Sequence, residues 1–300
     1  MIINKYHINN IFMSQKLIIS IQEQLLELTH KNFSLKYIER CLIPIFEYIN
    51  NSKKKKFLIS GSQGIGKSTL VEILKKNFKI FYQKKILILS LDDYYLKKNQ
   101  RLNLSKNKHP LLSTRGVPGT HDIKKLRKDI NSFDKSKYPI NIPIFDKLID
   151  DRLTKTQKIN SHTDILILEG WCCGCPPISK NFLYKNINKL EKEKDVKKIW
   201  RDYFNKELKD NYYQLFDKFD KLIYLEPPSF SFIINWRLKQ EKTLARKHNS
   251  DASMNKNEIA EFISHYEKIT KWMIKILPAK ANICIKIDRN QKIIKLKINK

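Results

Sequence analysis

Residues 58–69 read LISGSQGIGKST, and this stretch decides the fold. Positions 61–68 fit the pattern G-x-x-x-x-G-K-[ST], between an apolar run that predicts a strand (56–60) and a run with helical spacing (68–78). In that setting, glycines let backbone N–H groups curl around phosphate oxygens, and the start of the helix adds its positive dipole end. The pattern therefore predicts a site for the phosphates of a nucleotide.

The expected phosphate loop and the first turn of the following helix consist of Gly61, Ser62, Gln63, Gly64, Ile65, Gly66, Lys67, Ser68 and Thr69. In such a loop the Lys67 ammonium reaches the β- and γ-phosphates, which gives it a catalytic role, and the Ser68 hydroxyl ligates Mg²⁺. ATP and Mg²⁺ are the expected cofactors.

The chain has only seven glycines, and the four outside the phosphate loop lie in two further loops. Gly116 and Gly119 lie in STRGVPGTHD (113–122), and Gly170 and Gly174 lie in LILEGWCCGCPP (166–177). Because other turns in this chain use Asn, Asp, Ser and Pro, we expect these loops to need positive φ or a close backbone approach to a ligand.

Further apolar runs predict buried strands at 85–91, 164–168, 221–225 and 282–287. Near-continuous apolar strands separated by helices are typical of a parallel sheet covered on both faces. The predicted fold class is α/β, a three-layer αβα P-loop NTPase with a mostly parallel five-stranded sheet and helical lid and acceptor insertions. We expect an N-terminal helical element at 1–50 and one domain at 51–300, in which the long segment 92–163 carries function.

Carboxylates follow three of the predicted strands, at the edge where ligands bind in open α/β sheets. Asp92 is placed to orient and deprotonate an attacking hydroxyl, and Glu169 is placed to hold Mg²⁺. Glu226, before two prolines, is expected to cap a loop.

The composition limits the classes of partner. Lys and Arg number 59 against 30 Asp and Glu, a net charge of +29, but the lysines are scattered and form no basic face. This favours anionic substrates and gives no specific nucleic-acid partner. No run reaches the ~18 apolar residues of a membrane span, and the start does not resemble a signal peptide. We expect a cytoplasmic monomer or homodimer, with the cysteines of WCCGC packed as small apolar side chains.

Together, the phosphate loop, SLDDYY, RGVPGTHD, IFDK and LEGW resemble the D-glycerate 3-kinase family, in the phosphoribulokinase, uridine kinase and pantothenate kinase group. The resemblance continues through LEPPS, WRLKQE (236–241) and EFISHYEKITKWM (261–273). It implies a kinase of a small hydroxylated metabolite. The pair RGxPGTHD and EGWxxGxxP is more specific than the phosphate loop, which is generic to P-loop proteins.

The resemblance also implies roles for individual residues. Asp92 takes the place of the catalytic carboxylate, and an acceptor insertion at about 92–163 presents Tyr94, Arg115, His121, Asp122, Asp146 and Lys147. A helical insertion covers about 176–219. A lid at about 229–250 brings Arg237 and Arg246 to the nucleotide, because a guanidinium fork matches phosphate. LIDDRL stands where the family has a glycine-containing segment, so only Asp151 and Arg152 match there.

Three hypotheses remain open from the sequence. The leading one is transfer of the γ-phosphate of ATP to D-glycerate, giving 3-phospho-D-glycerate. The second keeps the chemistry and changes the acceptor to a nucleoside, a pantothenate-like or a sugar-related molecule. The third is a nucleic-acid-associated P-loop ATPase, for which the sequence lacks aromatic–basic interleaving.

Overall fold

The computed structural model describes the backbone of residues 5–248 and 255–299, and the side chains of residues 14–239, 255 and 257–299. A central six-stranded sheet has the order β2–β5–β1–β6–β7–β8. In that order, the strands span Ile86–Ser90 (β2), Ile165–Gly170 (β5), Lys56–Gly61 (β1), Lys221–Glu226 (β6), Ile283–Ile287 (β7) and Ile293–Ile298 (β8).

The five predicted strands are confirmed, and they form the parallel part of the sheet, from β2 to β7. The sixth strand, β8, pairs antiparallel with β7 at the edge and was not predicted. Its sequence, IIKLKI, is mostly exposed, so it lacks the continuous apolar run that marks the central strands.

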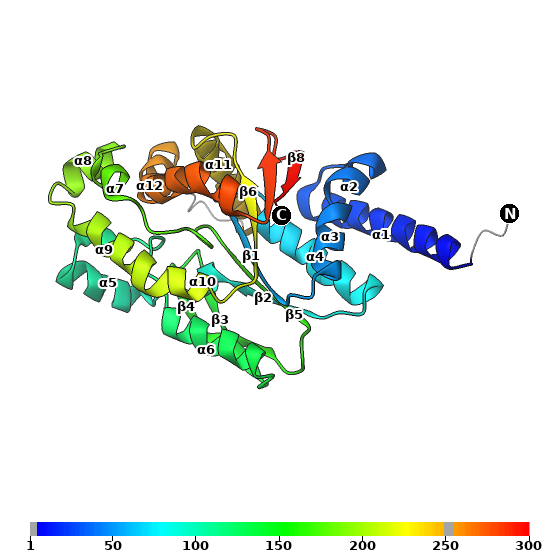
Figure 1. The fold of residues 1–300 in the computed structure, drawn as a ribbon. Helices are drawn as coiled ribbons and strands as arrows, with labels where there is room; N and C mark the ends of the chain where they lie inside the picture. The colour runs from blue at the N-terminus through cyan, green and yellow to red at the C-terminus, as the bar shows by residue number, and fades with distance from the viewer. Residues whose placement is uncertain (1–4, 249–254, 300) are drawn as a thin grey trace.

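Helices cover both faces of the sheet, which confirms the three-layer arrangement (Figure 1). Alternate residues of β1 face opposite sides: Phe57 and Ile59 join one hydrophobic cluster, and Leu58 joins the other. The first cluster includes residues of α1 (Lys5–Thr29), α2 (Leu35–Cys41), α3 (Ile43–Asn51) and α4 (Lys67–Phe81). The second includes the C-terminal half of α12 (Lys256–Lys280).

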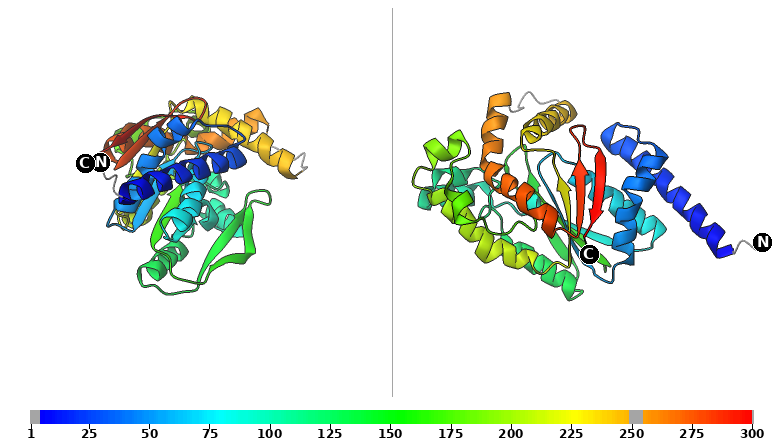
Figure 2. Two further views of the ribbon diagram at one scale, coloured as in Figure 1. Left: turned by 90° about the vertical axis from the view of Figure 1, so that its right-hand side faces the viewer. Right: turned by 45° about the horizontal axis from the view of Figure 1, so that its top comes forward.

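The segment between β2 and β5 contains short helices and a hairpin. Its elements are the 3₁₀ turns η1 (Leu91–Tyr94) and η2 (Pro110–Ser113), the helices α5 (Lys98–Asn107) and α6 (Ile123–Asp134), and the antiparallel strands β3 (Ile140–Asp146) and β4 (Asp151–Ile159). Figure 2 shows this hairpin, in green, projecting away from the central sheet. It was not predicted, because Pro143 interrupts β3 and most of β4 is exposed.

Short helices also fill the segment between β5 and β6. They are α7 (Lys180–Tyr184), α8 (Lys189–Lys194), α9 (Ile199–Glu207), the π-helical turn η3 (Leu208–Tyr213) and α10 (Gln214–Phe216). Helix α11 (Ser231–His248) follows β6. The division into a 1–50 element, two insertions and a lid stays a prediction. Within the described ranges, no helix combines the length and apolar character that a bilayer crossing requires.

Candidate functional site

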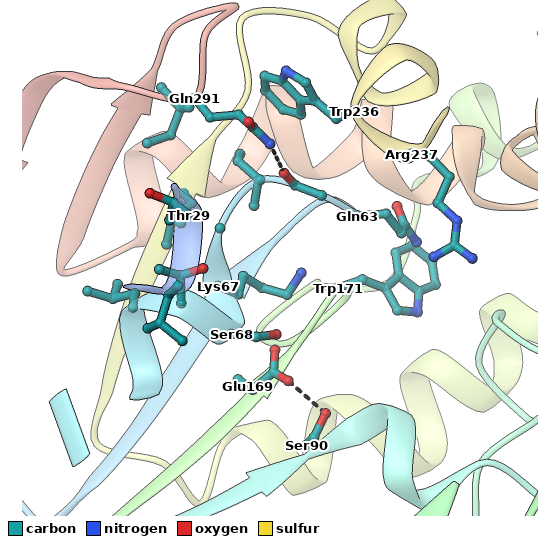
Figure 3. A pocket seen from close by; sticks show the side chains of 18 of the residues that line it. Thr29, Gln63, Lys67, Ser68, Ser90, Glu169, Trp171, Trp236, Arg237 and Gln291 are labelled. Carbon is teal, nitrogen blue, oxygen red and sulfur yellow. Dashed lines mark hydrogen bonds between the residues drawn. The ribbon is translucent and has the colours of Figure 1, made fainter. Parts of the chain in front are cut away.

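A cavity of about 750 Å³ lies at the carboxyl ends of the parallel strands. The end of β2, the end of β5 and the loop between β1 and α4 all contribute to its wall. Figure 3 shows side chains from these elements converging on one space. This is the edge at which open α/β sheets bind their ligands, as expected from the sequence.

The loop between β1 and α4 is held from two sides at Gly64. This residue has φ +72°, and a Cβ added here would lie 2.9 Å from Trp236 Cβ of α11. On the other side, Gln291 Nε2 in the turn between β7 and β8 donates a hydrogen bond to the Gly64 carbonyl oxygen over 2.5 Å (Figure 3). Glycine is required here both by the positive φ and by the close approach of α11.

Residues Gln63 to Thr69 line the cavity, whereas Gly61 and Ser62 are buried beneath it. The Lys67 ammonium donates to the Ser62 carbonyl oxygen over 3.0 Å. Burial lowers the pKa of Lys67, and the carboxylates of Glu169 and Asp92 oppose that shift. Lys67 is therefore a partly buried side chain whose ammonium binds its own loop, at the place expected for phosphate.

Glu169 is the second-last residue of β5 and is only 7% exposed. Its Oε1 accepts a hydrogen bond from Ser90 Oγ over 2.7 Å, and the exposed Ser68 side chain lies nearby (Figure 3). Burial raises the pKa of Glu169, and the Lys67 ammonium opposes that shift. A carboxylate and a hydroxyl beside a phosphate loop are the oxygen donors that suit Mg²⁺, so these residues fit the expected ion.

Asp92 and Asp93 follow β2 and both line the cavity. Lys147 Nζ lies 2.7 Å from Asp92 Oδ2. Burial pushes the pKa of Asp92 upward, but the charge and hydrogen bond of Lys147, together with Lys67, bring that pKa below its usual range. For Asp93, burial wins and raises the pKa to about 6, although its Oδ1 accepts a hydrogen bond from the Phe145 backbone N–H over 3.2 Å.

Arg115 also lines the cavity. Its guanidinium pairs with Asp150 and lies over the rings of Phe145 and Phe262, 5.5 and 5.6 Å from their centroids. The Tyr266 hydroxyl of α12 donates to the Arg115 carbonyl oxygen over 2.9 Å. The 113–122 loop is therefore held against α12 at Arg115.

The next residue, Gly116, lies against the same tyrosine. It has φ +143°, and a Cβ there would overlap the Tyr266 ring. This close approach and the positive φ confirm the glycine expectation for the 113–122 loop.

Four predicted acceptor residues do not line the cavity. The Tyr94 hydroxyl donates to Asp129 Oδ2 over 2.8 Å, inside the core. His121 stacks on Tyr95 and its Nδ1 lies 2.7 Å from the Tyr212 hydroxyl; burial lowers its pKa to about 3. The last two residues have structural positions at the ends of elements: Asp122 caps the N-terminus of α6, and Asp146, the last residue of β3, accepts a hydrogen bond from the Leu148 backbone N–H in the β3–β4 turn.

The lid residues are placed only in part. The Arg237 side chain of α11 is buried, lines the cavity and lies 5.5 Å from the Phe262 ring centroid. Arg246, also in α11, lies outside the residues whose side chains the structure describes.

Several cavity residues were not predicted, namely Ser90, Asp93, Tyr95, Trp236, Phe262, Tyr266 and Gln291. Asp93 and Tyr95 adjoin Asp92 in SLDDYY, and Phe262 and Tyr266 lie within the 261–273 stretch, so both sets had a sequence signal. Gln291 had none, because it reaches the phosphate loop from a turn 227 residues away.

No protein-family model matches the chain. "Uncharacterized kinase mug58" of Schizosaccharomyces pombe is 35% identical over 225 residues, which cover 69% of this chain and 76% of that protein. "Probable ATP-dependent kinase TDA10" of Saccharomyces cerevisiae is 28% identical over 257 residues, covering 78% and 82%. "D-glycerate 3-kinase, chloroplastic" of Arabidopsis thaliana is 28% identical over 220 residues, covering 69% and 45%.

Two solved structures have the same fold. The structure of the YGR205w protein superposes with a TM-score of 0.67 at 26% identity, covering 88% of this chain and 95% of that one. A D-glycerate 3-kinase from Cryptococcus neoformans superposes with a TM-score of 0.68 at 21% identity, covering 96% and 99%.

Proposed function

Because this chain belongs to the family of P-loop kinases that includes the fission-yeast kinase and the plant D-glycerate 3-kinase, we propose that it transfers the γ-phosphate of ATP to D-glycerate. The product would be 3-phospho-D-glycerate. The observation that carries the proposal is the shared cavity: the phosphate-loop residues Lys67 and Ser68 open onto the same space as Asp92 and Arg115. A donor phosphate and a small acceptor can therefore meet there.

In the proposed reaction, the acceptor hydroxyl gives its proton to the Asp92 carboxylate as its oxygen bonds to the γ-phosphorus. The bond from that phosphorus to the bridging oxygen of ADP breaks, and ADP leaves with the electron pair. Lys67 faces the transferring phosphate, where its charge offsets the negative charge of the transition state. Lys147 keeps Asp92 ionised in the resting protein.

We assign Mg²⁺ binding to Ser68 and Glu169. When bound, the ion neutralises phosphate charge and fixes the orientation of the β- and γ-phosphates. Ser90 orients the Glu169 carboxylate through its hydrogen bond. Arg237 in α11 is our proposed lid contact to the donor phosphates, since it lines the same cavity.

Arg115 supports an acceptor with a carboxylate. A guanidinium binds a carboxylate through two parallel hydrogen bonds, and this one already pairs with a carboxylate, that of Asp150. The glycerate carboxylate would bind Arg115 in place of Asp150 or beside it, with the primary hydroxyl of glycerate toward Asp92. An uncharged acceptor such as a nucleoside offers Arg115 no such partner.

The test is ADP release by the purified protein with ATP and Mg²⁺, with and without D-glycerate. L-glycerate, pantothenate, uridine and ribulose 5-phosphate serve as alternative acceptors. Strong stimulation by D-glycerate alone is the expected result. We expect Asp92→Asn to lower kcat by about 10²- to 10⁴-fold while ADP still binds.

Asp210→Asn is the matched control, because Asp210 is exposed and does not line the cavity, and it should keep full activity. Stimulation by a different acceptor would show that the glycerate assignment is wrong, while the proposed phosphate transfer from ATP would still hold. Full activity of Asp92→Asn would show that Asp92 is not the base.

A further inference from the structure

The turn between β3 and β4 places a carboxylate next to the arginine of the proposed acceptor site. Asp150 lies in this turn, and its Oδ1 pairs with Arg115 Nη1. Its other oxygen, Oδ2, lies 2.9 Å from Arg101 Nη2. Arg115 lines the cavity and Asp150 does not, so the carboxylate reaches the arginine from outside the cavity.

The position of Asp150 is fixed independently of Arg115. Its φ is +54°, a left-handed conformation in which Asp and Asn are enriched among residues that have a side chain. Arg101 Nη2 also donates to the Asp150 carbonyl oxygen over 2.6 Å. Arg101 is 1% exposed and is itself held by the carbonyl oxygens of Leu96 and Ser113, at 3.2 and 2.9 Å. The carboxylate is therefore anchored from its buried side.

Arg115 already has a counter-ion in the resting protein. Its guanidinium carbon lies 5.5 and 5.6 Å from the ring centroids of Phe145 and Phe262, and these rings carry no net charge. Among the described residues, Asp150 is the carboxylate that pairs with it. The charge of Arg115 is thus balanced before any acceptor binds.

This balance opposes the binding of a second carboxylate. Arg101, Asp150 and Arg115 together carry one net positive charge. A glycerate carboxylate at Arg115 would place two carboxylates on one guanidinium, and like charges at such short range repel each other. Without the charge of Asp150, the same three positions would carry two positive charges and attract the acceptor more strongly. An uncharged ligand would not respond to this difference.

We propose that Asp150 is a specificity-determining residue: it is a built-in counter-ion of Arg115 that competes with the carboxylate of the acceptor and weakens the binding of anionic acceptors relative to neutral ones. This inference rests on the proposed function, which supplies an acceptor with a carboxylate. The reaction leaves that carboxylate unchanged, so the same competition acts on the product and favours its release.

The experiment measures kcat and KM for D-glycerate from ADP release at saturating ATP and Mg²⁺, with the full chain. The variants are Asp150→Asn and Asp150→Gly, because both residues suit the left-handed backbone and both remove the charge. Arg101 keeps its three carbonyl partners in either variant. Glycerol, which has the same three-carbon skeleton with a hydroxymethyl group in place of the carboxylate, is the neutral ligand, measured as a competitive inhibitor.

Asp134→Asn is the matched control. The side chains of Asp134 and Asp150 are 35% and 34% exposed, and each belongs to an ion pair. Asp134 pairs with Lys56 at 3.0 Å and does not line the cavity. The control therefore removes a comparable charge at a place where no acceptor binds.

We expect both Asp150 variants to lower KM for D-glycerate by about tenfold and to leave kcat unchanged. The inhibition constant of glycerol and the dissociation constant of ADP should stay at their wild-type values. Asp134→Asn should change none of these quantities. Circular dichroism checks that each variant is folded.

Several results would overturn the inference while the proposed function stands. A higher KM in both variants would show that Asp150 orients Arg115 for the acceptor, and an unchanged KM would show that the two carboxylates do not compete. A lower KM in Asp150→Asn alone would assign the effect to the amide and not to the lost charge. If neither the wild type nor the variants respond to D-glycerate while ADP still binds, the acceptor assignment itself is wrong and the inference fails with it.

Discussion

Lys147 determines the charge state of the proposed base. Its ammonium lies 2.7 Å from Asp92 Oδ2, and it lowers the pKa of a carboxyl that burial would otherwise raise. Without Lys147, burial is opposed mainly by Lys67, so the pKa of Asp92 should rise. An Asp92 that binds a proton more readily is inactive as a base over a wider acidic range.

We therefore predict that Lys147→Met moves the acidic limb of the kcat/KM profile upward by about one to three pH units. The measurement is the rate of ADP release between pH 4 and pH 9. Lys147→Arg, which keeps the charge, should leave the limb near its wild-type position. A Met variant with a lower rate and an unmoved limb would show that Lys147 binds substrate without controlling the ionisation of Asp92.

The residues around Asp92 also show where sequence reasoning about single positions fails. The sequence indicated Asp92 and Tyr94, but the structure brings Asp92, Asp93 and Tyr95 to the cavity. The reason is the 3₁₀ turn η1, in which residues three apart lie on one face. In that turn Leu91 and Tyr94 are both fully buried, and the two aspartates between them line the cavity.

At the scale of elements, a buried ionic cluster joins the short helices after β5 to α12. Glu191 Oε2 lies 3.1 Å from Lys268 Nζ and 3.6 Å from Arg201 Nη1, and all three side chains are at most 1% exposed. Arg201 also binds Asp195 Oδ2 over 2.7 Å. Removing one member of such a cluster leaves a buried charge without compensation.

We predict that Glu191→Leu lowers the free energy of unfolding by about 3–5 kcal/mol, measured by urea denaturation. Glu193 of the same helix is a matched control, since it pairs with Lys189 at 3.9 Å while both side chains are more than half exposed. Glu193→Leu should change the same free energy by about 0.5 kcal/mol or less. Equal effects of the two substitutions would show that the cluster adds little to stability.

The elements differ in how visible they are in the sequence. The five parallel strands are near-continuous apolar runs, because both faces of the sheet are covered, and all five were predicted. Strand β4 and the edge strand β8 each pair with one neighbouring strand and stay largely exposed, and Pro143 interrupts the partly buried β3, so none of the three has such a run. Their positions depend on tertiary contacts that a local pattern does not encode.

At the scale of the whole molecule, the cavity depends on segments that are far apart in the chain. The turn between β7 and β8 binds Gly64 through Gln291, binds Trp236 of α11 through the Arg289 carbonyl oxygen, and binds Lys31 through the Asn290 carbonyl oxygen. The phosphate loop, α11 and the N-terminal helices therefore converge on one turn. A ligand bound in this cavity should therefore stabilise these three segments together, and with them the whole fold.

We predict that ADP with Mg²⁺, at a hundred times its dissociation constant, stabilises the protein by about 2.7 kcal/mol. For a chain of this size, that corresponds to a rise in Tm of about 5 °C in a thermal melt. Lys67→Ala should abolish the rise, because it removes the cation at the phosphate loop.

A duplex DNA oligonucleotide provides the contrast. Because the protein has a net charge of +29, it should bind the DNA in a salt-sensitive way, and the resulting rise in Tm should disappear in 0.2 M salt. A DNA effect that persists in salt, with no response to ADP, would contradict the kinase assignment and favour a nucleic-acid-associated ATPase.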